Sequence, residues 1–121
     1  MKIAVPSQGV NLESKIDMRF GRAKYFIVAN SDTWEFETVD NKQNIQAAAG
    51  AGIQAAQIVA DHGAEVLISG NCGPNAYRTL KAAGIEVFTG IDGTIKEVVN
   101  SYKAGKLQPA EGANVESHSG I

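Results

Sequence analysis

The stretch that decides the fold reads Glu65-Val66-Leu67-Ile68-Ser69-Gly70-Asn71-Cys72-Gly73-Pro74. Its first half is a short apolar run typical of a buried strand. Pro74 is a favoured first residue for a helix that runs to Ala83 and ends before Gly84. A buried strand that leads through a tight turn into a helix predicts an α/β domain built around this turn.

Downstream, the same pattern occurs once more. Residues 85–88 repeat the strand signal, and Thr94 with Glu97 predicts a capping box for a helix that Gly105 ends. Right-handed crossovers place the strands of successive βα units parallel to one another in one sheet.

Upstream, residues 3–5 form a short apolar run that Pro6 ends, which predicts a further buried strand. Residues 24–29 and 34–39 read as two strands joined by a turn at 30–33, since Trp34 alternates with polar neighbours. An Ala-rich segment then predicts a helix from residue 50 to residue 62, with Gly63 as its left-handed stop.

These elements predict a three-layer, ribonuclease H-like α/β fold. The first three strands form an antiparallel meander, and the later strands join beside the first. The sheet is then mixed and five-stranded, with one antiparallel strand and helices packed on its faces. A single domain is expected over residues 1–105. Residues 106–121 have little apolar periodicity and are expected to form a loosely ordered tail.

Composition excludes several classes of protein. The chain of 121 residues is long enough for one core. Its formal net charge of -2 argues against binding of nucleic acid, because proteins that bind nucleic acid usually carry a basic surplus. The apolar runs are far shorter than the roughly 20 residues that cross a bilayer. The N-terminus lacks the apolar region of a secretory signal, so we expect a cytoplasmic protein that does not associate with membranes.

Ligands in open α/β sheets bind outside the carboxyl ends of the parallel strands. In this chain that rule selects four loops, which are expected to meet at one edge of the sheet: residues 6–22, 40–50, 70–73 and 89–93.

Cys72, the only cysteine, lies in one of these loops. The positive end of the following helix dipole is expected to favour its thiolate, which makes it a candidate nucleophile or soft-metal ligand. The alternative is a small side chain that fills a tight turn. One cysteine cannot form an internal disulfide or supply the four thiolates of a conventional metal-sulfur site.

A second candidate is the segment around Arg19 and Arg22, where three cations fall within residues 19–24. The two arginines could face an anion, or they could form ordinary surface ion pairs. Phe20 is expected to pack rather than to touch a ligand. Asn71 either caps its turn or presents an amide to the ligand.

Several stretches together resemble the dinitrogenase iron-molybdenum cofactor biosynthesis family of small domains, over nearly the whole chain. They are Asp17-Met18-Arg19-Phe20-Gly21-Arg22-Ala23-Lys24-Tyr25-Phe26, Gly50-Ala51-Gly52, Gly70-Asn71-Cys72-Gly73-Pro74-Asn75-Ala76 and Ala83-Gly84-Ile85-Glu86-Val87-Phe88.

The resemblance implies a ribonuclease H-like fold and a protein that binds or carries an iron-sulfur or molybdenum-containing metal-sulfide cluster or cofactor precursor. It implies no catalytic residue, since the chain has no upstream cysteine triplet of a radical enzyme. The expected partners are metallocofactor assembly proteins or cluster acceptors. The chain is expected to be a monomer or a weak dimer, and two Cys72 thiols could share one cluster. The expected binding residues are Arg19, Phe20, Gly21, Arg22, Gly70, Asn71, Cys72 and Gly73, with Cys72 as the metal ligand.

Two rival functions come from other classes. Residues 50–55 match the G-x-G-x-x-A pattern of nucleotide-binding proteins, but a polar, Ala-rich stretch separates them from the preceding strand. A two-metal nuclease is rejected because residues 3–5 carry no acid. His62 is expected to interact with a helix C-terminus, and His118 to be solvated in the tail.

Overall fold

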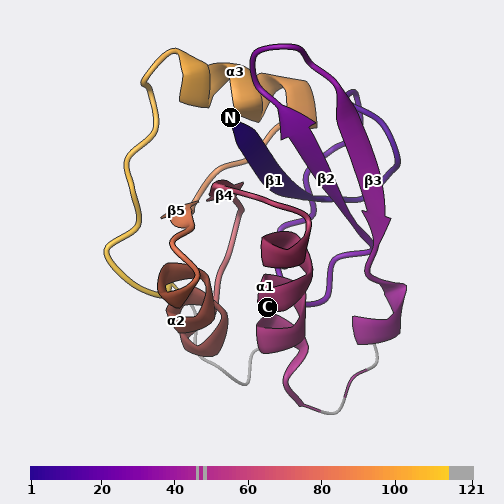
Figure 1. Cartoon of the computed structure of the whole chain (residues 1–121), viewed down its shortest axis with the longest axis vertical. Coiled ribbons are helices and arrows are strands. Elements are labelled where there is room, and N and C mark those ends of the chain that lie inside the picture. Colours follow the sequence, from indigo (N-terminus) through magenta and orange to yellow (C-terminus); the bar gives the residue numbers. More distant parts are fainter. Residues whose placement is uncertain (46, 48, 115–121) are drawn as a thin grey trace.

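The computed structural model describes residues 1–45, 47 and 49–114. In this part of the chain, five strands form one sheet in the order β3-β2-β1-β4-β5. The elements are β1 (Lys2–Ser7), β2 (Tyr25–Asn30), β3 (Phe36–Asp40), the short 3-10 helix η1 (Lys42–Asn44), α1 (Ala51–Asp61), β4 (Val66–Ile68), α2 (Pro74–Ala82), β5 (Glu86–Phe88) and α3 (Ile95–Lys103) (Figure 1).

The strand directions confirm the predicted mixed sheet. β2 runs antiparallel to both β1 and β3, whereas β1 pairs with β4 and β4 with β5 in parallel. β2 is therefore the one antiparallel strand. As predicted, the first three strands form a meander, and the two later strands join beside β1.

Side chains that alternate along the central strands build a hydrophobic layer on each face of the sheet. On β1, Ala4 belongs to the layer under α1 and α2, while Ile3 and Val5 belong to the layer under α3. All three side chains are fully buried. The sheet is thus covered on both faces, with two helices on one side and one helix on the other.

The predicted capping box at the start of α3 is confirmed. The backbone N–H of Glu97 donates to Thr94 Oγ1 over 3.2 Å, and the N–H of Thr94 donates to Glu97 Oε1 over 2.8 Å. These bonds with Thr94 hold the pKa of the Glu97 carboxyl below its ordinary value. The cap fixes the point at which the loop after β5 turns into α3.

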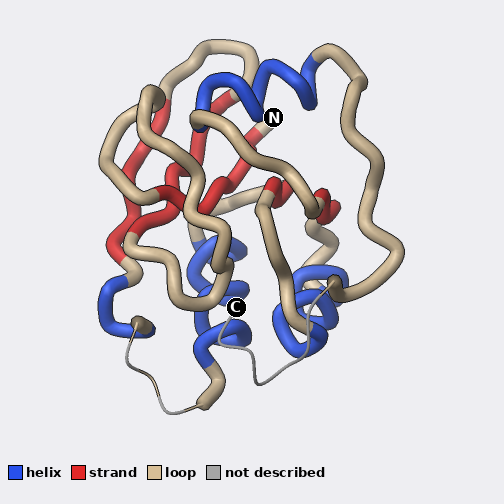
Figure 2. Tube along the Cα trace, turned by 180° about the vertical axis from the view of Figure 1, so that it is seen from behind, coloured by secondary structure: helices blue, strands red, loops and turns tan. Residues whose placement is uncertain are grey.

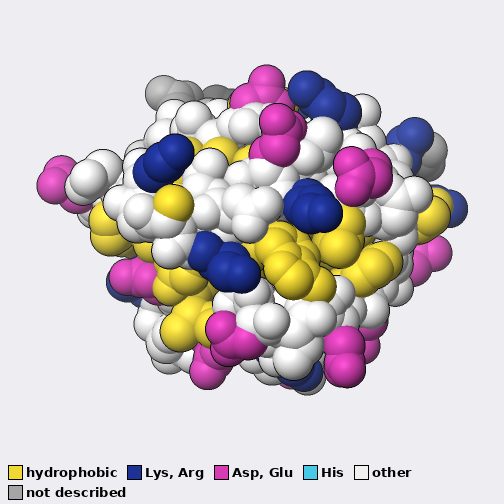
Figure 3. All heavy atoms as spheres, turned by 90° about the horizontal axis from the view of Figure 1, so that it is seen from above, with side chains coloured by type: hydrophobic (Ala, Val, Ile, Leu, Met, Phe, Trp, Pro, Cys, Tyr) yellow, Lys and Arg dark blue, Asp and Glu magenta, His cyan; other side chains and the backbone are white. Residues whose placement is uncertain are grey.

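The predicted start of the third strand at Trp34 is wrong. Trp34 has φ 63°, its N–H donates to the carbonyl of Asn30 over 2.8 Å, and β3 begins only at Phe36. The turn is longer than expected because Trp34 adopts a left-handed conformation in it. The ammonium groups of Lys96 and Lys103 lie 5.9 and 5.1 Å from the centre of the Trp34 ring. Figure 3 looks onto this end of the molecule, where hydrophobic side chains gather among lysine and arginine.

The loop between β1 and β2 passes from one face of the sheet to the other. Fully buried Ile16 belongs to the layer under α3, whereas fully buried Phe20, only four residues later, belongs to the layer under α1 and α2. Figure 2 shows long irregular segments crossing the molecule on the side seen from behind. Residues 17–19 therefore wrap around an edge of the sheet.

After α3, the chain passes from the face of the sheet under α3 to the face under α1 and α2. Leu107 packs against the first layer and Ala110 against the second. Pro109 forms an antiparallel bridge with Phe88, and the N–H of Ala110 donates to the carbonyl of Val87 over 2.7 Å. Residues 115–121 lie outside the described residues, so the loosely ordered tail expected from residue 106 stays a prediction. None of the described helices has the length and apolar character needed to cross a bilayer.

Candidate functional site

The structure brings the arginine-containing loop beside the cysteine turn. The backbones of Arg19 and Asn71 form a parallel bridge, and the N–H of Asn71 donates to the carbonyl of Met18 over 2.9 Å. The approach is close, because a Cβ atom on Gly70 would lie 2.4 Å from Met18 Cε and 3.0 Å from Met18 Cα. Segments about fifty residues apart in sequence therefore form one surface.

The predicted meeting of four loops at one edge of the sheet is confirmed, and the 6–22 loop connects the other three. The N–H of Ile16 donates to the carbonyl of Gly93 over 2.9 Å. Arg22 Nη1 donates to the carbonyl of Ile45 over 2.9 Å. The N–H of Gly90 donates to the carbonyl of Gly70 over 2.8 Å. We call this group of loops the loop edge.

Arg19 presents a guanidinium group to solvent at the loop edge. Its side chain is 48% exposed, and Nε lies 3.7 Å from Oδ1 of Asp17, whose side chain is only 10% exposed. The same carboxylate accepts the N–H of Arg19 over 3.0 Å and so fixes the turn. Asp17 orients Arg19 at a distance too long for a strong ion pair, and about half of the Arg19 side chain remains exposed.

Arg22 is used differently from Arg19. Its Nη1 donates to the carbonyls of Asn44 and Ile45 over 3.5 and 2.9 Å. The buried side chain of Asn41 strengthens the same junction, because its Nδ2 donates to the carbonyl of Gly21 over 3.2 Å. Arg22 therefore ties the 6–22 loop to η1, and its charge is partly committed to this structural role.

Phe20 and Gly21 shape the loop from the inside. The fully buried ring of Phe20 packs against Phe26, with ring centroids 5.2 Å apart. A Cβ atom on Gly21 would lie 2.9 Å from the backbone nitrogen of Gly52. The expected packing role of Phe20 is confirmed. Direct contact of Phe20 or Gly21 with a ligand stays a prediction, since both residues are buried within the loop.

The expectation of a stabilised thiolate at Cys72 is wrong. The side chain is fully buried in the layer under α1 and α2, and Sγ lies 3.7 Å from the carbonyl oxygen of Gly73. Burial raises the pKa of the Cys72 thiol to about 12. Desolvation outweighs the field of the helix dipole because the sulfur points into the core. Ligation of a metal by Cys72 stays a prediction, and it requires the turn to open.

Asn114 is a contact of the turn that the sequence did not reveal. Its Oδ1 accepts the N–H of Cys72 over 2.7 Å, and its own N–H donates to the carbonyl of Cys72 over 3.1 Å. Its Nδ2 donates to the carbonyl of Gly70 and to Oδ1 of Asn71, each over 3.2 Å. Asn71 therefore presents its amide to the tail. No periodicity or motif marks Asn114, because its role depends on where the tail returns.

Met18 is the second residue that sequence reasoning missed. It lies inside the matched Asp17-Phe26 stretch, and the residue is 39% exposed despite its contact with Gly70. A thioether beside a backbone turn offers a soft, polarizable surface. The signal was present in the sequence, as an apolar residue between an acid and an arginine in a loop.

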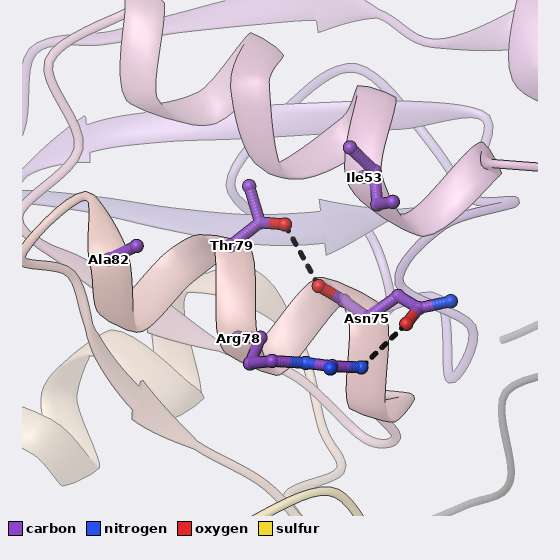
Figure 4. Close-up of a pocket in the computed structure, with 5 residues that line it drawn as sticks. All are labelled: Ile53, Asn75, Arg78, Thr79 and Ala82. Carbon is purple, nitrogen blue, oxygen red and sulfur yellow. Dashed lines mark hydrogen bonds between the residues drawn. The ribbon is translucent and has the colours of Figure 1, made fainter.

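An open depression of about 510 Å³ lies beside α1 and α2. Figure 4 shows Ile53 from α1 facing a row of side chains from α2, where Arg78 reaches back to Asn75. Arg78 Nη2 donates to Asn75 Oδ1 over 2.8 Å. Asn75 follows directly on Pro74, so the depression begins at the end of α2 that adjoins the cysteine turn.

In the described part of the chain, histidine, cysteine and acidic side chains form no group of three or more that could hold a metal ion. His62 is the C-cap residue of α1, and its Nδ1 lies 2.5 Å from Oε1 of Glu37. Its position at the helix end is the one expected from the sequence. His118 lies outside the described residues.

Comparison with known proteins gives a consistent family. The structure is similar to that of the apo form of the orange protein from Desulfovibrio gigas, with a TM-score of 0.92 and 41% identity, over 94% of this chain and 96% of that one. It is also similar to the solution structure of a Thermotoga protein assigned to NifB and to the DUF35 family, with a TM-score of 0.77 and 38% identity, over 89% of this chain and 91% of that one.

An uncharacterized protein of Methanocaldococcus jannaschii is 30% identical over 116 residues, which cover 92% of either chain. The family model described as dinitrogenase iron-molybdenum cofactor matches residues 1–105. The matched range contains every loop of the loop edge. The chain therefore belongs to the dinitrogenase iron-molybdenum cofactor family.

Proposed function

We propose that this protein binds and carries an iron-sulfur or molybdenum-containing metal-sulfide cluster, or a precursor of one, during metallocofactor assembly. The site is the surface formed by residues 17–22 and 70–73. The observation that carries the proposal is the bridge between Arg19 and Asn71, which joins two of the family's motifs in space. The name of the family supports an association with the iron-molybdenum cofactor.

The chemistry of this surface suits a polarizable anion. A metal-sulfide cluster carries negative charge on large sulfide ions, which accept hydrogen bonds and contact soft side chains. Arg19 offers an exposed guanidinium, Met18 offers a thioether, and α2 directs the positive end of its dipole toward the turn. These groups hold a cluster by charge and surface contact, so the proposal does not depend on a ligating thiolate.

The finer features of the proposal follow the resemblance. The protein is a non-enzymatic carrier in the cytoplasm, works as a monomer or weak dimer, and exchanges its cargo with assembly proteins or cluster acceptors. Its fold is of the ribonuclease H-like type, which the β3-β2-β1-β4-β5 strand order supports. A dimer that shares one cluster between two Cys72 thiols is disfavoured, since the thiol is buried.

The test is anaerobic incubation with iron or molybdate and excess sulfide, followed by desalting and visible absorption with metal analysis. A coloured, metal-containing protein is the expected result. Arg19→Ala should lower retention of the metal severalfold, whereas Lys24→Ala, which removes an exposed cation from the same segment, should not. A colourless, metal-free parent protein under every metal mixture would contradict the proposal.

The Cys72→Ala variant distinguishes electrostatic binding of the cluster from direct ligation of the metal by the sulfur. Electrostatic cradling predicts that this variant retains as much metal as the parent, because the thiol does not reach the surface. A loss larger than that of Arg22→Ala would show that the turn opens and that the sulfur ligates the metal.

A nucleotide or phosphate remains the alternative ligand. The structure gives Gly52 a packing role, since a Cβ atom there would lie 3.1 Å from Ala76 Cβ. The motif also follows η1 rather than a strand. Calorimetric titration with inorganic phosphate and with nucleotides tests this function, and saturable heat that Gly52→Ala abolishes would support it.

A further inference from the structure

The segment that follows α3 runs the length of the molecule and ends on the cysteine turn. In Figure 1 it descends from α3 past β5 to α2. On the way, Ala110 is held at both backbone groups. Its N–H donates to the carbonyl of Val87 over 2.7 Å, and its carbonyl accepts the hydroxyl of Tyr77 over 3.2 Å. The segment thus has a defined course along β5 and α2.

At the end of the described segment, Asn114 is hydrogen-bonded to the cysteine turn. Its Oδ1 takes the backbone N–H of Cys72 over 2.7 Å, the shortest of the four hydrogen bonds between Asn114 and the turn. An oxygen acceptor at this N–H occupies the place where a sulfide or oxygen of an anionic cargo would accept the same bond. Asn114 is itself exposed, so water can replace its hydrogen bonds when it leaves.

We propose that residues 107–114 form a strap that competes with the cargo for the cysteine turn. The proposal rests on the proposed function of the loop edge. With the strap in place, the N–H of Cys72 and the amide of Asn71 are satisfied by Asn114. When an anionic cluster binds, its acceptor atoms replace Asn114 Oδ1, and the end of the strap moves away from the turn.

The strap has a chemical purpose in a carrier. Without Asn114, the N–H of Cys72 would have no protein acceptor whenever the cluster is absent. The internal acceptor Asn114 Oδ1 satisfies this N–H in the empty protein and makes release easier, because the strap can return as the cargo leaves. The apparent association constant is then the intrinsic constant multiplied by the fraction of molecules whose strap is open.

Removal of the competing side chain provides the test. Parent, Asn114→Ala and Asn100→Ala proteins are titrated anaerobically with tetrathiomolybdate, a molybdenum-sulfide anion, and the bound fraction is followed by visible absorption. We expect Asn114→Ala to bind about tenfold more tightly than the parent. Asn100 is an exposed residue of α3, and its variant should match the parent.

Hydrogen exchange gives a second, independent readout. Saturation of the parent with tetrathiomolybdate should speed exchange of the Asn114 amide, which loses its bond to the Cys72 carbonyl. Protection of the Cys72 amide should persist, because its partner is now the cargo. An unchanged Asn114 amide at saturation would show that cargo and strap do not exclude each other, and would overturn the proposal.

The outcomes separate the strap from the proposed function. Equal or weaker binding by Asn114→Ala overturns the strap and leaves the carrier function standing. Binding by Asn114→Ala without binding by the parent supports a strap that closes the turn completely. If no protein binds tetrathiomolybdate or a cluster formed from iron and sulfide, the carrier function and the strap both fall.

Discussion

Gly21 rests directly on the first turn of α1, where a Cβ atom added to it would lie 2.9 Å from the nitrogen and 3.0 Å from the Cα of Gly52. Both neighbours are backbone atoms, which cannot rotate away as a side chain could. Gly21→Ala should therefore lower the free energy of unfolding by about 1–3 kcal/mol. Urea unfolding measures this change.

The matched control for this prediction is Gly112→Ala. A Cβ atom at Gly112 would meet nothing within 4 Å, so the substitution should leave stability nearly unchanged. If Gly21→Ala is as stable as Gly112→Ala, the close approach of the loop to α1 does not exist in solution.

Gly70 and Met18 form a second close contact, but one of a different kind. A Cβ atom on Gly70 would lie 2.6 Å from Met18 Sδ and 3.0 Å from Met18 Cα. Gly70→Ala should destabilise the protein by about 1–3 kcal/mol, and Met18→Ala in the same chain should recover part of this loss. A double-mutant cycle measures the coupling, and strictly additive effects would show that the two residues do not touch.

Substitution of Arg22 should mainly lower stability, whereas substitution of Arg19 should mainly weaken anion binding. Arg22→Ala removes a charged donor from the carbonyls of Asn44 and Ile45, and we expect it to cost about 2 kcal/mol of stability. Arg19→Ala should change stability by less than about 0.5 kcal/mol, since its guanidinium is half exposed, yet weaken anion binding. Thermal unfolding and tetrathiomolybdate titration are the two measurements, and the reverse pattern would reassign the roles.

Cys72 should be inert in the folded protein. Burial raises its pKa from 9.0 to about 12, so the thiolate is about a thousandfold scarcer than in the unfolded chain at pH 8. Iodoacetamide should therefore alkylate the native protein at most about a thousandth as fast as the urea-unfolded protein. Similar rates in the two states would mean that the turn opens readily.

The same shift predicts a pH dependence of stability. Because the folded-state pKa lies above the unfolded value, the contribution of the neutral thiol is fully present below pH 9.0 and is lost as pH rises toward about 12. Between pH 8 and about pH 11, the free energy of unfolding of the parent should fall more than that of Cys72→Ala, which has no thiol to titrate. Parallel slopes would contradict this prediction.

The order and direction of the strands could be predicted because each element carries its own local signal. The apolar runs of β1 and β4, the proline that opens α2 and the Thr94-Glu97 cap all depend on neighbours in sequence. Trp34 shows where such signals end. Its left-handed backbone follows from a hydrogen bond to Asn30 that the alternation of apolar and polar residues does not encode.

The meeting of the loops that form the candidate site could be predicted from the sequence, but the orientation of their side chains could not. The rule for open α/β sheets and the family motifs both select residues 17–22 and 70–73. Which way Cys72 and Phe20 point depends on how the loop and turn pack into the layer under α1 and α2. The contact of Asn114 with the turn depends on the path of the chain along β5. The residues next to position 114 carry no sequence signal for this long-range contact.

The loop that carries Arg19 is buried on one face of the sheet at Ile16 and on the other at Phe20. The positions of its three middle residues therefore depend on both halves of the core. A nascent or partly unfolded chain would have the same residues but not the surface that they form together in the folded protein. Under the proposed function, capture of a cluster would require the folded chain, and by mass action a bound cluster would raise the melting temperature of the protein.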